Sequence, residues 1–189
     1  PTMQYENTKK ALRRGASVFV EKPPAPNLSK TLELIACAKE RGVSFFCGFN
    51  RRFEPGITYI KNQFPPESRL VSLEGVFNTP SLNKPATYES DSWFYSNGIH
   101  ALDTLLFLKG ARPERITAAH TPGSSLIDGS YTALMMWPDG THARFSSYNS
   151  VGAKKEIYLV HGLGVSYTFE RGQLTVEQNG TIEKGTPSD

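Results

Sequence analysis

The run Val18-Phe19-Val20-Glu21-Lys22-Pro23 restricts the possible fold more than any other stretch of the chain. Its apolar, β-branched and aromatic beginning predicts a buried strand, which ends abruptly in an acid, a base and a proline. Proline cannot continue a central ladder, and a lysine–proline bond can adopt the cis form at low cost. Ligands of α/β proteins bind beyond the carboxyl ends of parallel strands. We therefore expect the Lys22 ammonium to face a ligand crevice.

The residues on both sides of this strand alternate between helical and strand patterns. A helix is predicted over residues 3–14, and the strand 16–20 follows directly. The next helix ends at Arg41, and four of its apolar residues repeat at helical spacing and are predicted to pack on the sheet: Leu28, Leu32, Ile35 and Ala36. A second short strand is predicted at 43–48. This alternation predicts an α/β domain over residues 1–50, with part of a doubly wound parallel sheet.

From residue 51 onward the pattern changes to one helix and then mostly strands. The helix is predicted at 54–62, and the strands at 69–78, 116–121, 130–137, 141–148, 156–161, 166–170 and 173–177. Turn-forming residues connect them. We predict an α+β domain over residues 51–189, with an open, largely antiparallel sheet flanked by helices. The stretch Gly162-Leu163-Gly164 precedes a strand pattern, so it predicts a hairpin connection instead of a phosphate cradle.

Composition argues against several classes of function. With 38% hydrophobic and 21% charged residues, the 189-residue chain has an ordinary globular composition. Its net charge of +3 is not gathered in a basic block, which argues against nucleic-acid binding, and no apolar run reaches the roughly 18 residues of a membrane span. Cys37 and Cys47 lie in apolar patterns, which predicts reduced thiols and a cytoplasmic location. The scattered histidines show no metal-ligand spacing, so no metal site is expected.

A second candidate site lies at the start of a predicted helix with an apolar stripe. Ser96 or Asn97 is expected to cap this helix, which places His100 in its first turn. A cation is disfavoured there, which favours a neutral imidazole that can accept a proton. Asp103 shares the same face and can orient the ring. Judged from these residues alone, capping or packing the helix is the more common role of such a histidine, and a surface lysine in a turn is the more common role of Lys22.

Three segments in this order resemble the Gfo/Idh/MocA family of NAD(P)-dependent sugar and polyol dehydrogenases: Glu21-Lys22-Pro23, Gly48-Phe49-Asn50-Arg51-Arg52-Phe53, and Gly98-Ile99-His100 with Asp103. The resemblance implies the C-terminal part of such an oxidoreductase: part of a Rossmann domain, then a substrate and oligomerisation domain that is itself shortened at its C-terminus. It implies NAD or NADP as cofactor, hydride transfer with a sugar or polyol hydroxyl, and a homo-oligomer formed through the open sheet. The chain has no Gly-x-Gly-x-x-Gly turn to bind a pyrophosphate, so the isolated 189 residues are expected to be inactive.

The resemblance also implies roles for individual residues. The catalytic pair would be Lys22 and His100. The cofactor would contact Thr2, Glu21, Lys22, Pro23 and Arg51. The substrate hydroxyls would contact Arg52, Tyr95, Asn97 and His100.

One position departs from the family pattern. The catalytic aspartate that members carry four residues before the histidine is Ser96 in this chain. A hydroxyl holds no negative charge near neutral pH and cannot stabilise an imidazolium as a carboxylate does. Two alternatives therefore stay open beside a dehydrogenase: a non-catalytic regulatory or binding protein of the same fold, and an NAD-dependent relative that cleaves glycosidic bonds. The sequence also leaves open the sugar and the choice between NAD and NADP.

Overall fold

The computed structural model describes residues 2–64, 70–80, 94–121, 129–149 and 151–185. The chain divides into two compact units. Unit 1 contains Pro1–Phe49 and Ala86–Ser96, and unit 2 contains Asn50–Pro85 and Asn97–Asp189. Each unit is described by itself below.

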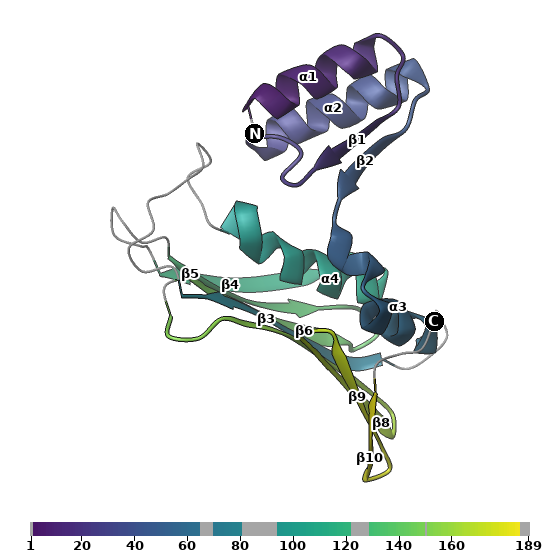
Figure 1. Ribbon diagram of the computed structural model, residues 1–189, viewed down its shortest axis with the longest axis vertical. Coiled ribbons are helices and arrows are strands. Elements are labelled where there is room, and N and C mark those ends of the chain that lie inside the picture. Colours follow the sequence, from purple (N-terminus) through teal and green to yellow (C-terminus); the bar gives the residue numbers. More distant parts are fainter. Residues whose placement is uncertain (1, 65–69, 81–93, 122–128, 150, 186–189) are drawn as a thin grey trace. The chain divides into compact units, whose positions relative to one another are not determined.

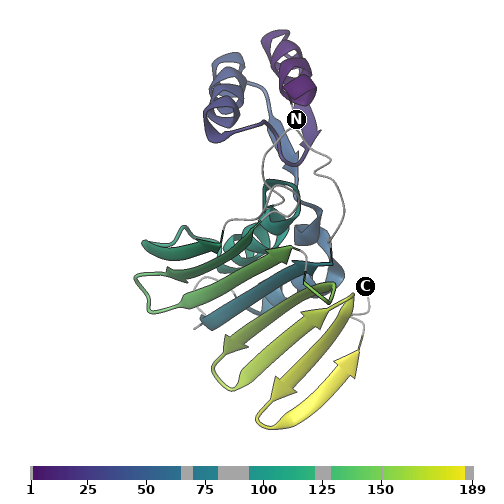
Figure 2. The same ribbon diagram turned by 90° about the vertical axis from the view of Figure 1, so that its left-hand side faces the viewer.

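Among its described residues before Asn50, unit 1 contains two helices and two parallel strands. In chain order these are α1 (Thr2–Arg13), β1 (Val18–Glu21), α2 (Leu28–Arg41) and β2 (Phe45–Gly48). The strands pair in parallel from Val18 opposite Phe45 to Glu21 opposite Gly48. Figures 1 and 2 show α1 and α2 side by side along this pair of strands. The predicted alternation of helices and parallel strands is confirmed.

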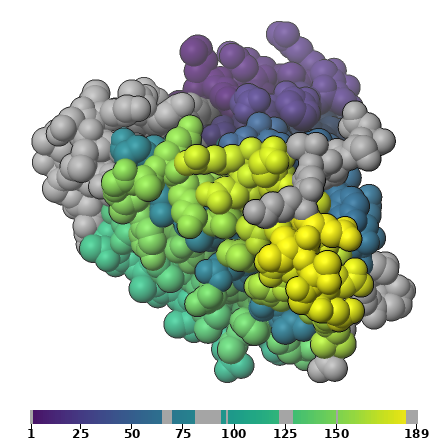
Figure 3. Space-filling view, turned by 60° about the horizontal axis from the view of Figure 1, so that its bottom comes forward, coloured from purple at the N-terminus to yellow at the C-terminus, as the bar shows by residue number. Residues whose placement is uncertain are grey.

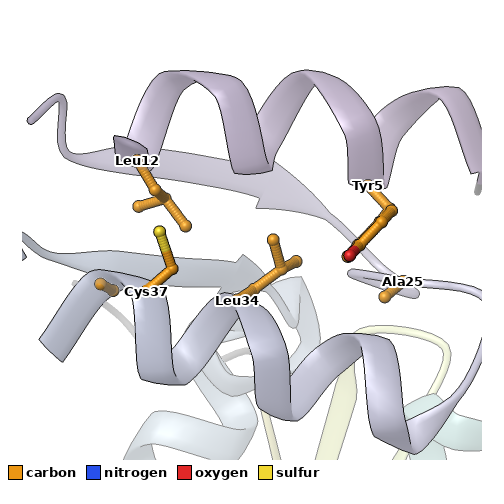
Figure 4. Close-up of a cluster of buried hydrophobic side chains, with 6 residues drawn as sticks. Tyr5, Leu12, Ala25, Leu34 and Cys37 are labelled. Carbon is orange, nitrogen blue, oxygen red and sulfur yellow. The ribbon is translucent and has the colours of Figure 1, made fainter. Parts of the chain in front are cut away.

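The core of unit 1 lies where α1 and α2 meet, and Figure 4 shows its side chains pointing toward one another. It is formed by buried side chains from both helices and the turn after β1: Tyr5, Leu12, Ala25, Leu34, Cys37 and Ala38. Three partly buried residues of the strands and of the approach to β2 pack against it: Val18, Val43 and Phe45. Burial of this apolar surface holds the two helices together.

The prediction of which face of α2 is buried is wrong. Leu28, Leu32 and Ile35 are 71%, 54% and 37% exposed, and Ala36 is exposed too. The helix instead turns Leu34, Cys37 and Ala38 inward. Both sets of residues repeat at helical spacing, so the periodicity predicts the helix but cannot tell which stripe meets α1.

Unit 2 carries a large sheet and two helices. Its helical segments are η1 (Asn50–Phe53), α3 (Pro55–Gln63) and α4 (Ile99–Lys109); a π-helical turn, η2 (Phe94–Gly98), directly precedes α4 and lies across the division between the units. Its strands are β3 (Leu70–Thr79), β4 (Arg115–Thr121), β5 (Ser130–Met136), β6 (His142–Asn149), β7 (Lys155–Gly162), β8 (Val165–Glu170), β9 (Gln173–Gln178) and β10 (Thr181–Gly185).

These strands form one sheet in the order β10-β9-β8-β7-β3-β6-β5-β4, and Figure 2 shows them fanned out. Within the described residues, β3 and β6 pair in parallel and the other neighbours are antiparallel. The predicted open, largely antiparallel sheet is therefore confirmed. The stretch Gly162-Leu163-Gly164 connects the antiparallel strands β7 and β8, as predicted for a hairpin.

Helices α3 and α4 cover one face of this sheet (Figure 1). The contacts are close: a Cβ atom on Gly75 of β3 would lie 3.0 Å from Leu105 Cδ1 of α4, and one on Gly56 of α3 would lie 2.3 Å from Phe169 Cδ2 of β8. Side chains that alternate along the central strands are buried under the helices, among them Leu73, Phe145, Tyr158 and Val160. In Figure 3 the opposite face, formed largely by the green and yellow strands, is turned toward the viewer.

The start of α4 differs from the prediction. The helix begins at Ile99 with Gly98 at the N-cap position, and no side chain caps it. Ser96 and Asn97 instead belong to η2, whose helical backbone leads directly into α4. Because the backbone is already helical before Ile99, the N–H groups that a cap would satisfy occur earlier in the chain. The predicted capping role of Ser96 or Asn97 is therefore wrong.

Candidate functional site

The turn after β1 carries the residues predicted to contact a cofactor. Glu21 is the exposed last residue of β1, Lys22 is half-buried and Pro23 is buried. The peptide bond between Lys22 and Pro23 is cis. Because β1 and β2 run in parallel and Glu21 lies opposite Gly48, this turn stands at the carboxyl edge of the strand pair. This is the edge where α/β proteins bind their ligands.

Thr2, also predicted as a cofactor contact, is the exposed first residue of α1. Three residues later, Tyr5 turns into the helix–helix core and is 2% exposed. Its hydroxyl donates to Glu33 Oε2 on α2 over 2.5 Å, and Lys9 Nζ donates to the same carboxylate oxygen over 2.7 Å. Tyr5 thereby links α1 to α2.

Arg51 and Arg52 follow β2 in η1, and both are held by acids of unit 2. Arg51 binds Glu156 of β7 through two hydrogen bonds, from Nε over 2.7 Å and from a terminal nitrogen over 3.0 Å. Arg52 binds Asp103 of α4 in the same bidentate way, over 2.8 and 2.5 Å. Such paired contacts fix a guanidinium in position and orientation. The two arginines thus tie the segment after β2 to β7 and α4.

The Arg51 contact continues into a buried polar chain. The Tyr158 hydroxyl donates to Glu156 Oε1 over 3.0 Å and also hydrogen-bonds the Thr104 side chain. Burial, with a contribution from the Glu156 carboxylate, raises the pKa of the Tyr158 phenol, so the group keeps its proton. Thr104 is fully buried, and its hydroxyl lies 2.8 Å from the carbonyl oxygen of His100. Side chains from η1, β7 and α4 therefore form one hydrogen-bonded chain, which ends at the backbone carbonyl of His100.

His100 is the second residue of α4 and is 6% exposed. Its ring stacks on Phe77 of β3, with the centroids 6.2 Å apart and the planes inclined by 25°. The predicted partner Asp103 uses both carboxylate oxygens to bind Arg52. The Arg52 guanidinium is thus held at α4 by Asp103, the residue three positions after His100. A role of Asp103 in orienting the ring stays a prediction.

The remaining predicted substrate contacts lie in η2. Tyr95 is 46% exposed, and its ring packs edge-on against Phe94 with the centroids 5.6 Å apart. Asn97 is half-buried. The backbone of Ser96 belongs to η2, and its side chain lies outside the described part of the structure. Tyr95 therefore presents an exposed phenol just before the helix that carries His100.

The predicted site residues fall into two groups. Thr2, Glu21, Lys22, Pro23 and Tyr95 belong to unit 1, whereas Arg51, Arg52, Asn97 and His100 belong to unit 2. Neither metal-binding clusters nor membrane-length apolar helices occur among the residues that the structure describes.

Sequence reasoning missed Gln4, whose amide nitrogen donates to the backbone carbonyls of Glu21 and Pro23, and it missed the polar chain of Glu156, Tyr158 and Thr104. Glu156 offered a signal, because it alternates with the apolar residues Tyr158 and Val160 and so falls on the covered face of β7. An acid at such a position needs a cation or donors.

Residues 1–49 match a family model described as "Oxidoreductase family, NAD-binding Rossmann fold". The uncharacterized oxidoreductase YhhX of Escherichia coli is 32% identical over 116 residues, which are 59% of this chain and 33% of that protein. Inositol 2-dehydrogenase 2 of Paenarthrobacter aurescens is 29% identical over 189 residues, which are 91% of this chain and 55% of that protein.

Among solved structures, UDP-N-acetylglucosamine 3-dehydrogenase from Acidithiobacillus ferrooxidans has the same fold, with a TM-score of 0.85 and 22% identity. That match covers 100% of this chain and 62% of the other. The chain thus spans about a third to a half of the length of these two curated relatives. Residues 1–49 thus match the Gfo/Idh/MocA family of oxidoreductases, and the chain shares its fold with a solved oxidoreductase of this family from Vibrio cholerae, with a TM-score of 0.83.

Proposed function

We propose that this chain is the C-terminal part of a dehydrogenase that transfers a hydride between a nicotinamide cofactor and a sugar or polyol hydroxyl carbon. The observation that carries the proposal is the placement of Glu21-Lys22-Pro23 at the carboxyl edge of a parallel strand pair, within residues that match an NAD-binding family. Relatives that act on inositol and on a nucleotide sugar support the substrate class.

Lys22 would hold the reacting oxygen. It follows directly after β1, and its ammonium offers three donors but no acceptor. A hydrogen bond from this ammonium to the substrate hydroxyl would draw charge toward the oxygen and fix its distance from the carbon that reacts.

His100 would accept the hydroxyl proton as general base. His100 is 6% exposed, and its contact with Phe77 holds the ring in position. Arg52, Tyr95 and Asn97 would contact further hydroxyl groups of the substrate. That Lys22 and His100, from different units, act on the same hydroxyl is part of this proposal.

The cofactor, NAD or NADP, would lie against unit 1. The chemistry of the edge fits its nicotinamide end, because the half-buried Lys22 and the surrounding backbone offer donors and acceptors beside buried Pro23. Thr2, Glu21, Lys22, Pro23 and Arg51 are the proposed contacts, although Arg51 already binds Glu156 and would keep that pairing. When bound, the nicotinamide ring supplies the hydride acceptor.

The test uses the full-length protein and measures sugar- or polyol-dependent formation of NAD(P)H. We expect Lys22→Ala and His100→Ala each to lower kcat by roughly 10²- to 10⁴-fold, the usual contribution of a positioned acid–base or electrostatic group. The matched controls are Lys10→Ala, at an exposed position of α1, and His142→Ala, at an exposed position of β6. Both should keep kcat within about twofold of the wild type. Unchanged kcat in both Lys22→Ala and His100→Ala would refute the proposal.

A second candidate function follows from Ser96, which stands where members of the family carry an acid. Without that carboxylate the fold can serve as a binding or regulatory protein with little turnover. The two functions separate in Ser96→Asp: a gain of activity of 10²-fold or more in a nearly inactive parent would favour the regulatory protein. Release of free sugar without net NADH would instead identify a glycoside-cleaving enzyme.

We further propose that the protein forms a homo-oligomer through the open face of the unit 2 sheet and works in the cytoplasm. The open face mixes apolar side chains such as Leu134 with the ion pair between Arg144 and Glu74. Such a mixture is typical of an interface between protein copies. The free thiols of Cys37 and Cys47 support a reducing compartment.

A further inference from the structure

Gln4, in the first turn of α1, reaches across unit 1 to the turn that carries Lys22. Its amide nitrogen lies 2.5 Å from the carbonyl oxygen of Glu21 and 2.8 Å from that of Pro23. A primary amide has two N–H groups, so one nitrogen can donate to both oxygens at once. These carbonyls belong to the residues immediately before and after Lys22.

This contact restrains the backbone on both sides of one residue. Lys22 lies beyond the last residue of β1, where the ladder with β2 no longer restrains the chain. The Gln4 amide supplies a donor to each of the two carbonyl oxygens, and the contact to the Pro23 carbonyl is partly buried. Gln4 therefore limits how far the Cα atom of Lys22 can move relative to α1.

We propose that Gln4 is the positioning residue for Lys22 in catalysis, an inference that rests on the proposed function above. It does not touch the reacting atoms. It keeps the base of the lysine side chain in place, so that the ammonium meets the substrate oxygen at hydrogen-bonding distance. A displacement of about 1 Å in such a group costs up to roughly 10²-fold in rate.

The role inferred for Gln4 depends on its two N–H donors, and substitutions of similar size that remove these donors can test it. In Gln4→Glu the carboxylate has acceptors only and would face two carbonyl oxygens. In Gln4→Met the length and shape are kept, without a donor and without a charge. Asn7, an exposed amide one turn further along α1, provides the matched controls Asn7→Asp and Asn7→Met.

The experiment uses the full-length protein, with two readouts. We expect Gln4→Glu and Gln4→Met to lower kcat roughly 10- to 100-fold and to change KM less than threefold, because the lost interaction matters at the reacting oxygen. The backbone amide of Lys22 should exchange its hydrogen at least tenfold faster in both variants. Both quantities should stay within twofold in the Asn7 variants.

The outcomes separate this inference from the proposed function. If Lys22→Ala lowers kcat but Gln4→Met leaves kcat unchanged, Gln4 is not a positioning residue and the proposed function stands. If Lys22→Ala leaves kcat unchanged, the role proposed for Lys22 is wrong, and with it the catalytic role inferred for Gln4; the proposed function itself is refuted when His100→Ala also leaves kcat unchanged. A raised KM together with unaltered Lys22 exchange in Gln4→Met would also overturn the inference.

Discussion

The residues that connect α1 to α2 add a charged hydrogen-bond network to the apolar core between the two helices. Lys9 and Tyr5 of α1 and Lys30 of α2 all donate to the Glu33 carboxylate or to the Tyr5 hydroxyl. The hydrogen bond from Lys9 makes the largest contribution and the one from Tyr5 the next largest, and they lower the pKa of Glu33 from its ordinary 4.5 to about 2. Glu33 therefore stays charged in the folded chain under conditions that protonate it in the unfolded one.

The lowered pKa of Glu33 predicts a pH dependence of stability. Between about pH 4.5 and pH 2 the unfolded state takes up a proton that the folded state does not, so this contribution to stability is lost as the pH falls. We expect Glu33→Gln to have a lower Tm than the wild type at pH 7 and a shallower decline in Tm over that window. Scanning calorimetry at several pH values measures both. Glu40→Gln, at the exposed end of α2, serves as control, and an equally shallow decline there would contradict the assignment.

At the scale of elements, α2 carries two apolar stripes and buries one. Leu34 is fully buried against α1, whereas Leu32 is 54% exposed. We expect Leu34→Ala to lower the free energy of unfolding by about 2–5 kcal/mol, as typical for a buried leucine. Leu32→Ala should change it by no more than about 0.5 kcal/mol. Urea unfolding measures the free energy of unfolding of both variants. Equal decreases in the two variants would contradict the burial of Leu34 in place of Leu32.

At the scale of the whole molecule, the open face of the large sheet predicts self-association. Leu134 of β5 lies on this face, opposite Arg144 of β6. Ile116 of β4 lies opposite Met135, whose side chain is buried on the helix-covered face. We expect the Leu134→Glu variant to sediment with the mass of a monomer in sedimentation velocity, because an unpaired charge in an interface is costly. Ile116→Glu should leave the mass unchanged. An unchanged mass in Leu134→Glu would argue against this interface.

Much of the fold was predictable because its signals are local. The apolar run before Glu21, the glycine after α1 and the turn residues between strands are properties of neighbours in the chain, and they predicted the order of helices and strands. Strand β10 was missed because Thr181–Gly185 is polar and gives no alternating apolar pattern. The π-helical turn before α4 was missed too, because Ser96 and Asn97 have the composition of a helix cap.

The sequence by itself predicted the resemblance to the Gfo/Idh/MocA family, which the family match confirms for residues 1–49, and it predicted a helix–strand alternation followed by a strand-rich part. The tertiary structure decided which stripe of α2 is buried and which acids hold Arg51 and Arg52. Glu156 is 105 residues from Arg51, and local propensity carries no information about such a pairing. The pairing is decided by which strands lie beside β3 and by the need of the half-buried Glu156 carboxylate for donors.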